Sequence, residues 1–134
     1  IPKILEKYKL MINPIDIHDI LYYATLFIGE GATMASECAV MGTPSIYVNS
    51  LTAGTLEDQE KNGLVFIYNS TDGVLNKATE LLENSDTKIN QQRKCSQVMK
   101  NKINVNNFIK WLVLNYPKSI DELNENPDIQ YSLK

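Results

Sequence analysis

The stretch that decides the fold is Thr25-Leu-Phe-Ile-Gly-Glu-Gly-Ala-Thr-Met-Ala-Ser-Glu-Cys-Ala-Val-Met-Gly-Thr-Pro-Ser-Ile-Tyr-Val-Asn49. Leu26 to Ile28 predicts a strand too apolar to have a wet face, as in a parallel sheet that helices cover on both sides. The small residues from Gly29 to Ala32 predict a turn, and Thr33 to Met41 predicts a short helix. Ser45 to Val48 predicts the next strand. The stretch therefore predicts an α/β unit that presents a helix N-terminus beyond the end of a strand.

The rest of the chain continues this alternation of strands and helices. Gly42 is placed to end the helix at Thr33 to Met41 in a left-handed conformation, with Pro44 just beyond it. Before the stretch we expect a buried strand at 10–13 and a helix capped by Asp16. After it we expect a helix with a Thr55/Asp58 capping box that ends at Gly63, a strand at 64–68, a helix to about 84 with Val74, Leu75, Ala78, Leu81 and Leu82 buried, a polar helix at 85–102 and a last helix at 104–116.

These elements predict the α/β class: a Rossmann-like, three-layer α/β/α fold with a small parallel sheet and a helical C-terminus. We expect residues 1–117 to form this domain and residues 118–134 to form a loosely attached polar tail. Only three or four strands are visible, and the chain starts without an initiator Met. We therefore expect it to be a fragment of a larger protein.

Length and composition exclude several classes of function. The chain has 134 residues, of which 43% are hydrophobic, so it can build a real core. Its net charge of -3 and pI near 5.1 disfavour nucleic acid as a partner. No apolar run approaches the roughly 18 to 20 residues that span a bilayer, and no leader is visible, so a cytoplasmic protein is expected. The spacing of Cys38 and Cys95 matches neither a metal site nor a disulfide framework, which predicts free thiols.

The turn before the helix predicted at Thr33 to Met41 is a candidate phosphate site. A helix N-terminus offers unsatisfied backbone N–H groups and a partial positive charge, which bind phosphate where small residues permit close approach. Gly31, Ala32 and Thr33 meet that condition at the carboxyl end of a strand, where ligands gather in open α/β sheets. The alternative is a plain tight turn in which Thr33 only caps the helix. A dinucleotide fingerprint is disfavoured because Met34 stands at its third glycine position and no acid ends the strand before Asn49.

Glu37 adds a candidate ribose ligand to this turn. It lies one helical turn after Thr33, so the two side chains share a face of the helix. A carboxylate at that place can accept both hydroxyls of a ribose whose phosphates bind the N-terminal amides. The alternative is an acid that only complements the helix dipole.

These residues carry a resemblance. Gly31-Ala-Thr-Met-Ala-Ser-Glu37, followed by Gly42-Thr-Pro44 and a strand, resembles the nucleotide-binding segment in the C-terminal half of GT-B-fold enzymes. Particularly similar are UDP-N-acetylglucosamine 2-epimerases and the N-acetylglucosaminyl transferase that makes lipid II. With the run from His18 to Gly29 included, the chain looks more similar still to an uncharacterised prokaryotic family related to those epimerases, often associated with surface polysaccharide genes. The resemblance is strong from about His18 to Gly63.

The resemblance implies a partial GT-B C-terminal half, with residues 1–117 as a nucleotide-sugar-binding domain and a missing N-terminal domain as its partner. It implies that a UDP-sugar or related nucleotide is bound, with Glu37 at the ribose. The residues implied at the diphosphate are Gly31, Ala32, Thr33, Met34 and Ser36. The epimerase segment has Ser-Gly-Gly where this chain has Gly31-Ala-Thr33, so the nucleotide and the donor geometry stay open.

Other candidates lie around the same predicted cleft. Thr52, Gly54 and Thr55 follow the second strand of the stretch and are candidates to contact the sugar or a phosphate, although a helix start alone explains Thr55. Gln59 is a weaker candidate of the same kind. His18, the only histidine, is either a general base or, beside Asp19, a structural hydrogen-bond partner. No catalytic set or metal cluster emerges, so the catalytic residues are unknown and no metal or cofactor is expected.

Two functions are therefore open. The first is the UDP-sugar-binding half of an epimerase-like or glycosyltransferase-like protein in surface polysaccharide biosynthesis. The second is a non-catalytic α/β interaction module that keeps the fold without nucleotide binding. For this module the partner surface is expected around Phe108 to Leu112, where Trp111 adds apolar area. Whether the parent protein is an enzyme is left open.

Overall fold

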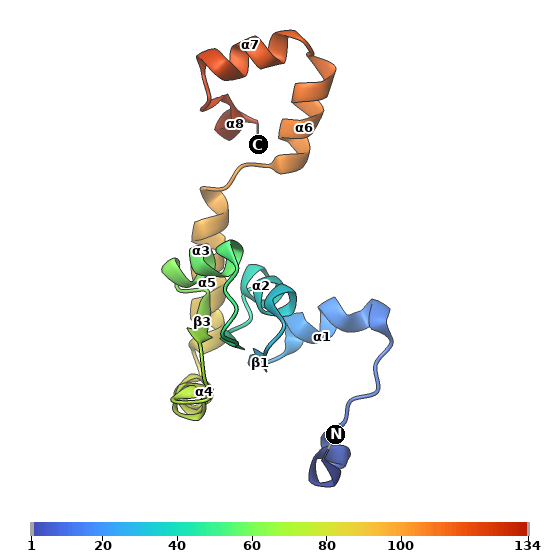
Figure 1. Cartoon of the computed structure of the whole chain (residues 1–134), viewed down its shortest axis with the longest axis vertical. Helices are drawn as coiled ribbons and strands as arrows, with labels where there is room; N and C mark the ends of the chain where they lie inside the picture. The colour runs from blue at the N-terminus through green and yellow to red at the C-terminus, as the bar shows by residue number, and fades with distance from the viewer. Residues whose placement is uncertain (1, 134) are drawn as a thin grey trace. The chain divides into compact units, whose positions relative to one another are not determined.

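The fold is described by a computed structural model of residues 2–133 (Figure 1). The chain divides into two compact units between Cys95 and Ser96. The first unit holds a parallel sheet in the order β1-β2-β3, formed by Phe27–Gly29, Ser45–Val48 and Val65–Tyr68. Phe27 of β1 is in register with Ser45 of β2, which in turn is in register with Val65 of β3. The α/β class and the small parallel sheet are confirmed.

Helices make up most of the remaining described chain. In the first unit these are η1 (Lys3–Tyr8), η2 (Pro14–Asp16), α1 (Ile17–Tyr23), α2 (Ala32–Val40), α3 (Gly54–Lys61) and α4 (Val74–Glu83). The helix α5 (Thr87–Lys100) crosses the division between the units. The second unit holds α6 (Val105–Leu114), α7 (Lys118–Glu125) and α8 (Ile129–Ser132).

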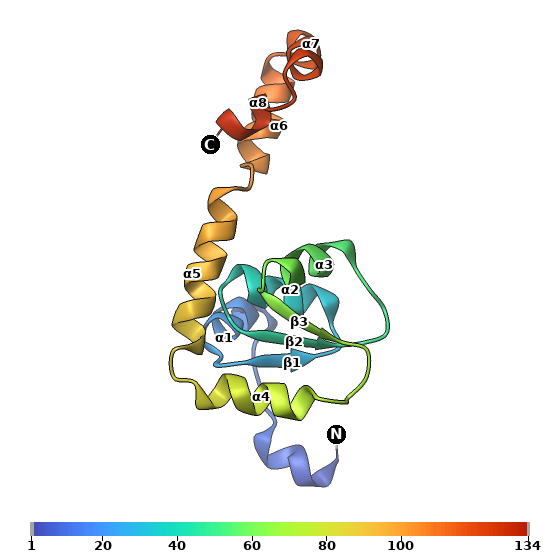
Figure 2. The same cartoon turned by 90° about the vertical axis from the view of Figure 1, so that its left-hand side faces the viewer.

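The sheet of the first unit is covered on both faces, with α2 and α3 on one side and α4 on the other (Figure 2). Side chains of β2 alternate between these layers, because successive residues of a strand point to opposite faces. Ile46 packs in a cluster with Val74 and Ala78 of α4. Ser45 faces the other way, and its Oγ donates a hydrogen bond to the Ala35 carbonyl of α2 at 3.2 Å. The predicted three-layer arrangement is therefore confirmed for this unit.

Two glycine turns end helices and lead into strands. Gly42 has φ +74°, its N–H donates to the Ala39 carbonyl, and the Thr43 N–H donates to the Cys38 carbonyl. This is the Schellman pattern of a helix C-terminus, and Gly63, with φ +68°, repeats it after α3. Both glycine positions were predicted from the sequence and are confirmed.

The turn after α2 also ties α1 to the sheet. Thr43 is fully buried, and its hydroxyl donates to the Leu21 carbonyl in the last turn of α1 at 2.8 Å. Helix C-termini leave carbonyls without intrahelical partners, and a buried one costs free energy unless it is bonded. Thr43 satisfies one such carbonyl from a position 22 residues later in the sequence.

The polar helix α5 closes the amino-terminal end of the sheet. Lys88 Nζ donates to the Ala24 carbonyl at 2.7 Å and also to the Tyr22 carbonyl, just before β1. Gln91, only 4% exposed, donates from Nε2 to the Leu64 carbonyl at 2.7 Å, just before β3. The Cys95 thiol donates to the Val40 carbonyl at the end of α2. The side chains of α5 therefore bond backbone carbonyls at the C-terminal ends of α1 and α2 and at the residue that precedes β3.

One prediction about the N-terminal part of the chain is wrong, and a second is confirmed only for the position of the residue. Residues 10–13 form no strand within the described chain, and Met11 is 81% exposed. A run of four apolar residues carries no periodicity, so its sequence could not show that it lacks a paired neighbour. Asp16 stands at the N-cap of α1, but its carboxylate accepts no capping bond among residues 2–133. Asn13 caps the preceding turn instead, since its Oδ1 accepts from the Ile15 N–H.

Three further local predictions are corrected. The helix α3 begins at Gly54 with Ala53 at its N-cap, so Thr55 stands inside the helix and the expected capping box is wrong. On α4, Val74 and Ala78 are buried as predicted, but Leu75 and Leu82 are 78% and 55% exposed. The sheet is too narrow to cover an apolar face as wide as the one the sequence predicts.

The segment predicted as a polar tail contains two helices, α7 and α8. The buried Ser119 donates its hydroxyl to the Leu112 carbonyl at 2.7 Å and so links α7 to α6. The predicted helix start at Asn104 is confirmed, because Asn104 Oδ1 accepts from the Asn107 N–H at 3.1 Å. The second unit is thus more helical than its Asn-rich and acidic sequence predicts.

Replacing Gly42 by alanine is expected to destabilise the first unit by about 1 to 3 kcal/mol, since a side chain at positive φ is strained. The added Cβ would also lie 2.9 Å from the Gln92 Cα, which belongs to the backbone of α5. Urea unfolding followed by circular dichroism measures the change. The matched control is Gly54→Ala, which adds a Cβ with nothing within 4 Å and should leave stability unchanged or slightly raised. Equal stabilities for the two variants would contradict the role of the Gly42 turn.

Candidate functional site

The residue that precedes the first turn of α2 has no side chain. Gly31 is the N-cap, with φ −83° and ψ 106°, and the first helical hydrogen bond runs from the Ala35 N–H to the Gly31 carbonyl. The N–H groups of Ala32, Thr33 and Met34 precede that bond and are the orphan donors of the helix. Because the helix starts at Ala32, Thr33 lies inside it, and the interpretation of Thr33 as the cap is wrong.

The loop after β2 lies beside this turn. Asn49 Nδ2 donates to the Glu30 carbonyl at 3.4 Å, and Asn49 Oδ1 accepts from the Leu51 N–H at 3.0 Å. The Tyr47 hydroxyl donates to the Leu51 carbonyl at 2.9 Å and so attaches the same loop to β2. The candidate residues Thr52, Gly54 and Thr55 are exposed on this loop and the start of α3. The turn after β1 and the loop after β2 therefore share the carboxyl-terminal edge of the sheet.

Ser36 faces α3. Gln59 Nε2 donates to the Ser36 Oγ at 2.9 Å, while Gln59 Oε1 is buried with no hydrogen-bond partner among residues 2–133. The sequence gives Gln59 only a minor role at the cleft, whereas the structure uses it to hold α3 against α2. Ser36 is thus placed one turn into the helix rather than at its tip with Gly31.

Glu37 meets His18, a contact that sequence reasoning missed. The His18 Nε2 lies 3.5 Å from the Glu37 Oε2, although the residues belong to different helices. His18, Ser36, Glu37, Val40 and Met41 line a pocket of about 230 Å³. Sequence reasoning placed Asp19 beside His18, and nothing in the spacing of His18 and Glu37 could have indicated that α1 packs on α2.

Cys38 lies under this site and is fully buried. Burial raises the pKa of its thiol from 9.0 to about 11, the negative charge of Glu37 adds to the rise, and Lys88 opposes it. Burial likewise raises the pKa of the Cys95 thiol. Both cysteines are free, as the sequence predicts, and neither environment favours the thiolate that reacts or binds metal.

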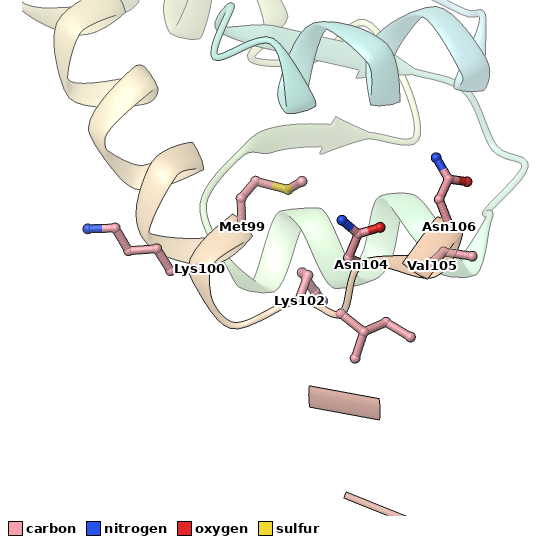
Figure 3. A pocket seen from close by; sticks show the side chains of 7 residues that line it. Met99, Lys100, Lys102, Asn104, Val105 and Asn106 are labelled. Atoms are coloured by element: carbon pink, nitrogen blue, oxygen red, sulfur yellow. The ribbon is translucent and has the colours of Figure 1, made fainter. Parts of the chain in front are cut away.

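Other features of the described chain lie away from this site. In residues 2–133 there is no group of three His, Cys, Asp or Glu side chains that could hold a metal ion. Within the same range, each helix is too short or too polar to cross a membrane. A pocket of about 520 Å³ lies in the second unit where α5 leads into α6 (Figure 3). It is lined by Met99, Lys100, Lys102, Ile103, Asn104, Val105 and Asn106, none of which was predicted at the nucleotide site.

The fold and this edge of the sheet define a Rossmann-like α/β protein. The chain belongs to the family described as "Protein of unknown function (DUF354)", whose match covers residues 2–110. That range covers the first unit from residue 2 onward and ends within α6. No curated protein and no solved structure matches the chain.

The two thiols are expected to resist a thiol reagent at pH 8 in the folded protein and to react at once in denaturant, because their raised pKa values keep them protonated. Mass spectrometry after labelling measures this, with Cys38→Ala and Cys95→Ala assigning each site. Since the unfolded Cys38 loses its proton near pH 9 and the folded one near 11, this thiol should also lower stability as the pH rises through that window. Rapid native labelling of Cys38 at pH 8 would contradict the burial argument.

Proposed function

We propose that the first unit binds the nucleotide part of a UDP-sugar, as the C-terminal half of a GT-B-like epimerase or glycosyltransferase does, and acts in surface polysaccharide biosynthesis. The observation that carries the proposal is the start of α2, where the exposed Gly31 precedes three backbone N–H groups that have no intrahelical acceptor, just beyond the carboxyl end of β1. Such donors, with the positive end of a helix dipole, suit a diphosphate. An N-terminal domain of the same protein is the proposed partner that completes the site.

Glu37 supports a nucleotide over a simple phosphate. It lies one turn beyond Thr33 on the same helix, and its side chain is 38% exposed, so it remains accessible to a ligand. One helical turn rises about 5.4 Å, which suits a ligand whose phosphate is at the helix tip and whose ribose hydroxyls lie beside the carboxylate. The loop with Thr52, Gly54 and Thr55 lies at the same edge and is proposed for the sugar side.

The second candidate is the interaction module without nucleotide binding. One observation favours it: Ile109 and Val113, one turn apart on α6, are 52% and 67% exposed. Phe108 and Trp111, predicted at this surface, instead pack against each other with ring centroids 6.1 Å apart and are partly buried. A partner surface on α6 would therefore centre on Ile109 and Val113.

The first test measures whether nucleotide binding depends on the Glu37 carboxylate. UDP-N-acetylglucosamine and UDP titrated into the 134-residue chain should shift amide resonances of the β1–α2 turn in NMR spectra. Glu37→Gln should weaken this binding roughly ten- to hundred-fold, since hydrogen bonds to a charged group are worth about 1.5 to 3 kcal/mol. The control, Glu83→Gln, removes an exposed carboxylate from α4 on the far side of the sheet and should leave binding unchanged. Binding that is insensitive to Glu37→Gln would end the ribose assignment, and absence of binding by the wild type would favour the interaction module.

The second test measures whether the phosphates of UDP approach the backbone N–H groups that follow Gly31. Gly31→Ala should fold with at most about 1 kcal/mol of stability lost, because alanine is a poorer N-cap than glycine but the nearest atom to the added Cβ is the Met34 Cβ at 3.9 Å. It should nevertheless weaken UDP by about ten-fold, the cost of a methyl group placed against a close contact. Uridine, which has no phosphate, should bind the variant and the wild type equally. Equal losses for UDP and uridine would show that the phosphates do not approach Gly31.

A further inference from the structure

The contact between His18 and Glu37 lies at the surface, where an ion pair contributes little to folding stability. The Nε2 and Oε2 atoms are 3.5 Å apart, and the two side chains are 63% and 38% exposed. Exposed pairs of this kind add little to folding stability, because solvent screens them and two side chains must be ordered. The pair is therefore better placed to act on the orientation of Glu37 than on the stability of the fold.

The two side chains also line one small pocket. Its volume is about 230 Å³, and Val40 and Met41 supply apolar walls beside the polar groups. Sites for whole drug-sized ligands are usually about 300 to 1,000 Å³. The pocket is thus too small for a whole nucleotide, and a ligand bound at Glu37 would lie outside it, along the face of α2 that carries Thr33.

The chemistry of the pair leaves Glu37 able to bind a ligand. An imidazole can donate from Nε2–H both as the protonated ring and as one neutral tautomer, so the contact does not require a charged histidine. A carboxylate has about four acceptor positions, so His18 at 3.5 Å from Oε2 leaves acceptor positions of Glu37 for hydroxyl groups. A flexible glutamate that must be immobilised on binding costs about 0.5 to 1.5 kcal/mol. A neighbour that already restricts its rotamers removes part of that cost.

We propose that His18 is a positioning residue for Glu37: its Nε2 holds one carboxylate oxygen so that the other meets the ribose hydroxyls of the nucleotide. This inference rests on the proposed function, because it assumes that Glu37 binds the ribose. It assigns His18 neither a proton-transfer step nor a direct contact with the ligand. The packing of α1 against α2 thereby becomes part of the binding site.

The test compares UDP binding by NMR in the wild type, His18→Ala, His18→Gln, Glu37→Gln and the double variant His18→Ala/Glu37→Gln. His18→Ala should weaken UDP roughly two- to ten-fold, the cost of ordering one more side chain. His18→Gln should restore binding to within about two-fold of the wild type, because its amide can donate from nearly the same place. Thermal unfolding of His18→Ala should be unchanged, and its loss of binding should vanish in the Glu37→Gln background.

Each failure has its own signature. Wild-type binding and a Glu37→Gln defect without any His18→Ala defect would overturn the positioning role and leave the proposed function intact. A His18→Ala loss that persists in the Glu37→Gln background would also overturn it, since His18 would then contact the ligand itself. No UDP binding by the wild type would overturn the proposed function and this inference together.

A measurement without ligand tests the contact alone. The imidazole resonances of His18 should shift on Glu37→Gln and stay in place on Glu83→Gln, which is on the opposite side of the sheet. His18 is the only histidine, so its ring signals need no further assignment. Unchanged His18 resonances in Glu37→Gln would overturn the pairing whatever the nucleotide result.

Discussion

The buried turn from Gly42 to Pro44 is the constraint on which the first unit depends. Its three residues are almost inaccessible to solvent, and they connect α2 to β2 at the centre of the sheet. The left-handed Gly42 bonds back to the end of α2, the Thr43 hydroxyl bonds the end of α1, and α5 approaches Gly42 too closely to admit a Cβ. One short segment thereby sets the positions of three helices, because buried backbone groups must find their hydrogen-bond partners in a close-packed interior.

The two ends of the sheet are finished in opposite ways. At the amino-terminal end, Lys88 and Gln91 of α5 bond the carbonyls that precede β1 and β3. At the carboxyl-terminal end, the β1–α2 turn and the β2–α3 loop are joined through Asn49, and the first N–H groups of α2 follow a residue with no side chain, Gly31. This asymmetry is the reason for proposing a ligand site at the carboxyl-terminal end of the sheet. Side chains of α5 close the amino-terminal end, whereas the carboxyl-terminal end presents backbone N–H donors.

Sequence reasoning succeeded where a local pattern has a single physical solution. The apolar run at 45–48 is a strand, the run predicted at 64–68 is a strand from Val65 to Tyr68, and the glycine after a predicted helix is left-handed at its C-terminus. It failed where several residues compete for one local role. Asp16 and Thr55 have the chemistry of caps, but the Asp16 carboxylate makes no capping bond at the N-cap of α1, and Thr55 lies inside α3, which begins at Gly54. Leu75 has the right period for a buried face, yet the three-stranded sheet ends before it can cover that residue.

By itself, the sequence determined the α/β class, the strand, turn, helix and strand order around Gly31, and the presence of Glu37 one turn inside the helix. These follow from period, residue size and backbone freedom, which act over a few neighbouring residues. Only the tertiary structure decided that His18 meets Glu37, that Gln59 binds Ser36, and that Lys88 and Gln91 of the polar helix α5 bond the backbone that leads into β1 and β3. Those contacts join residues 19 to 64 positions apart, and their formation depends on how helices pack rather than on any local pattern.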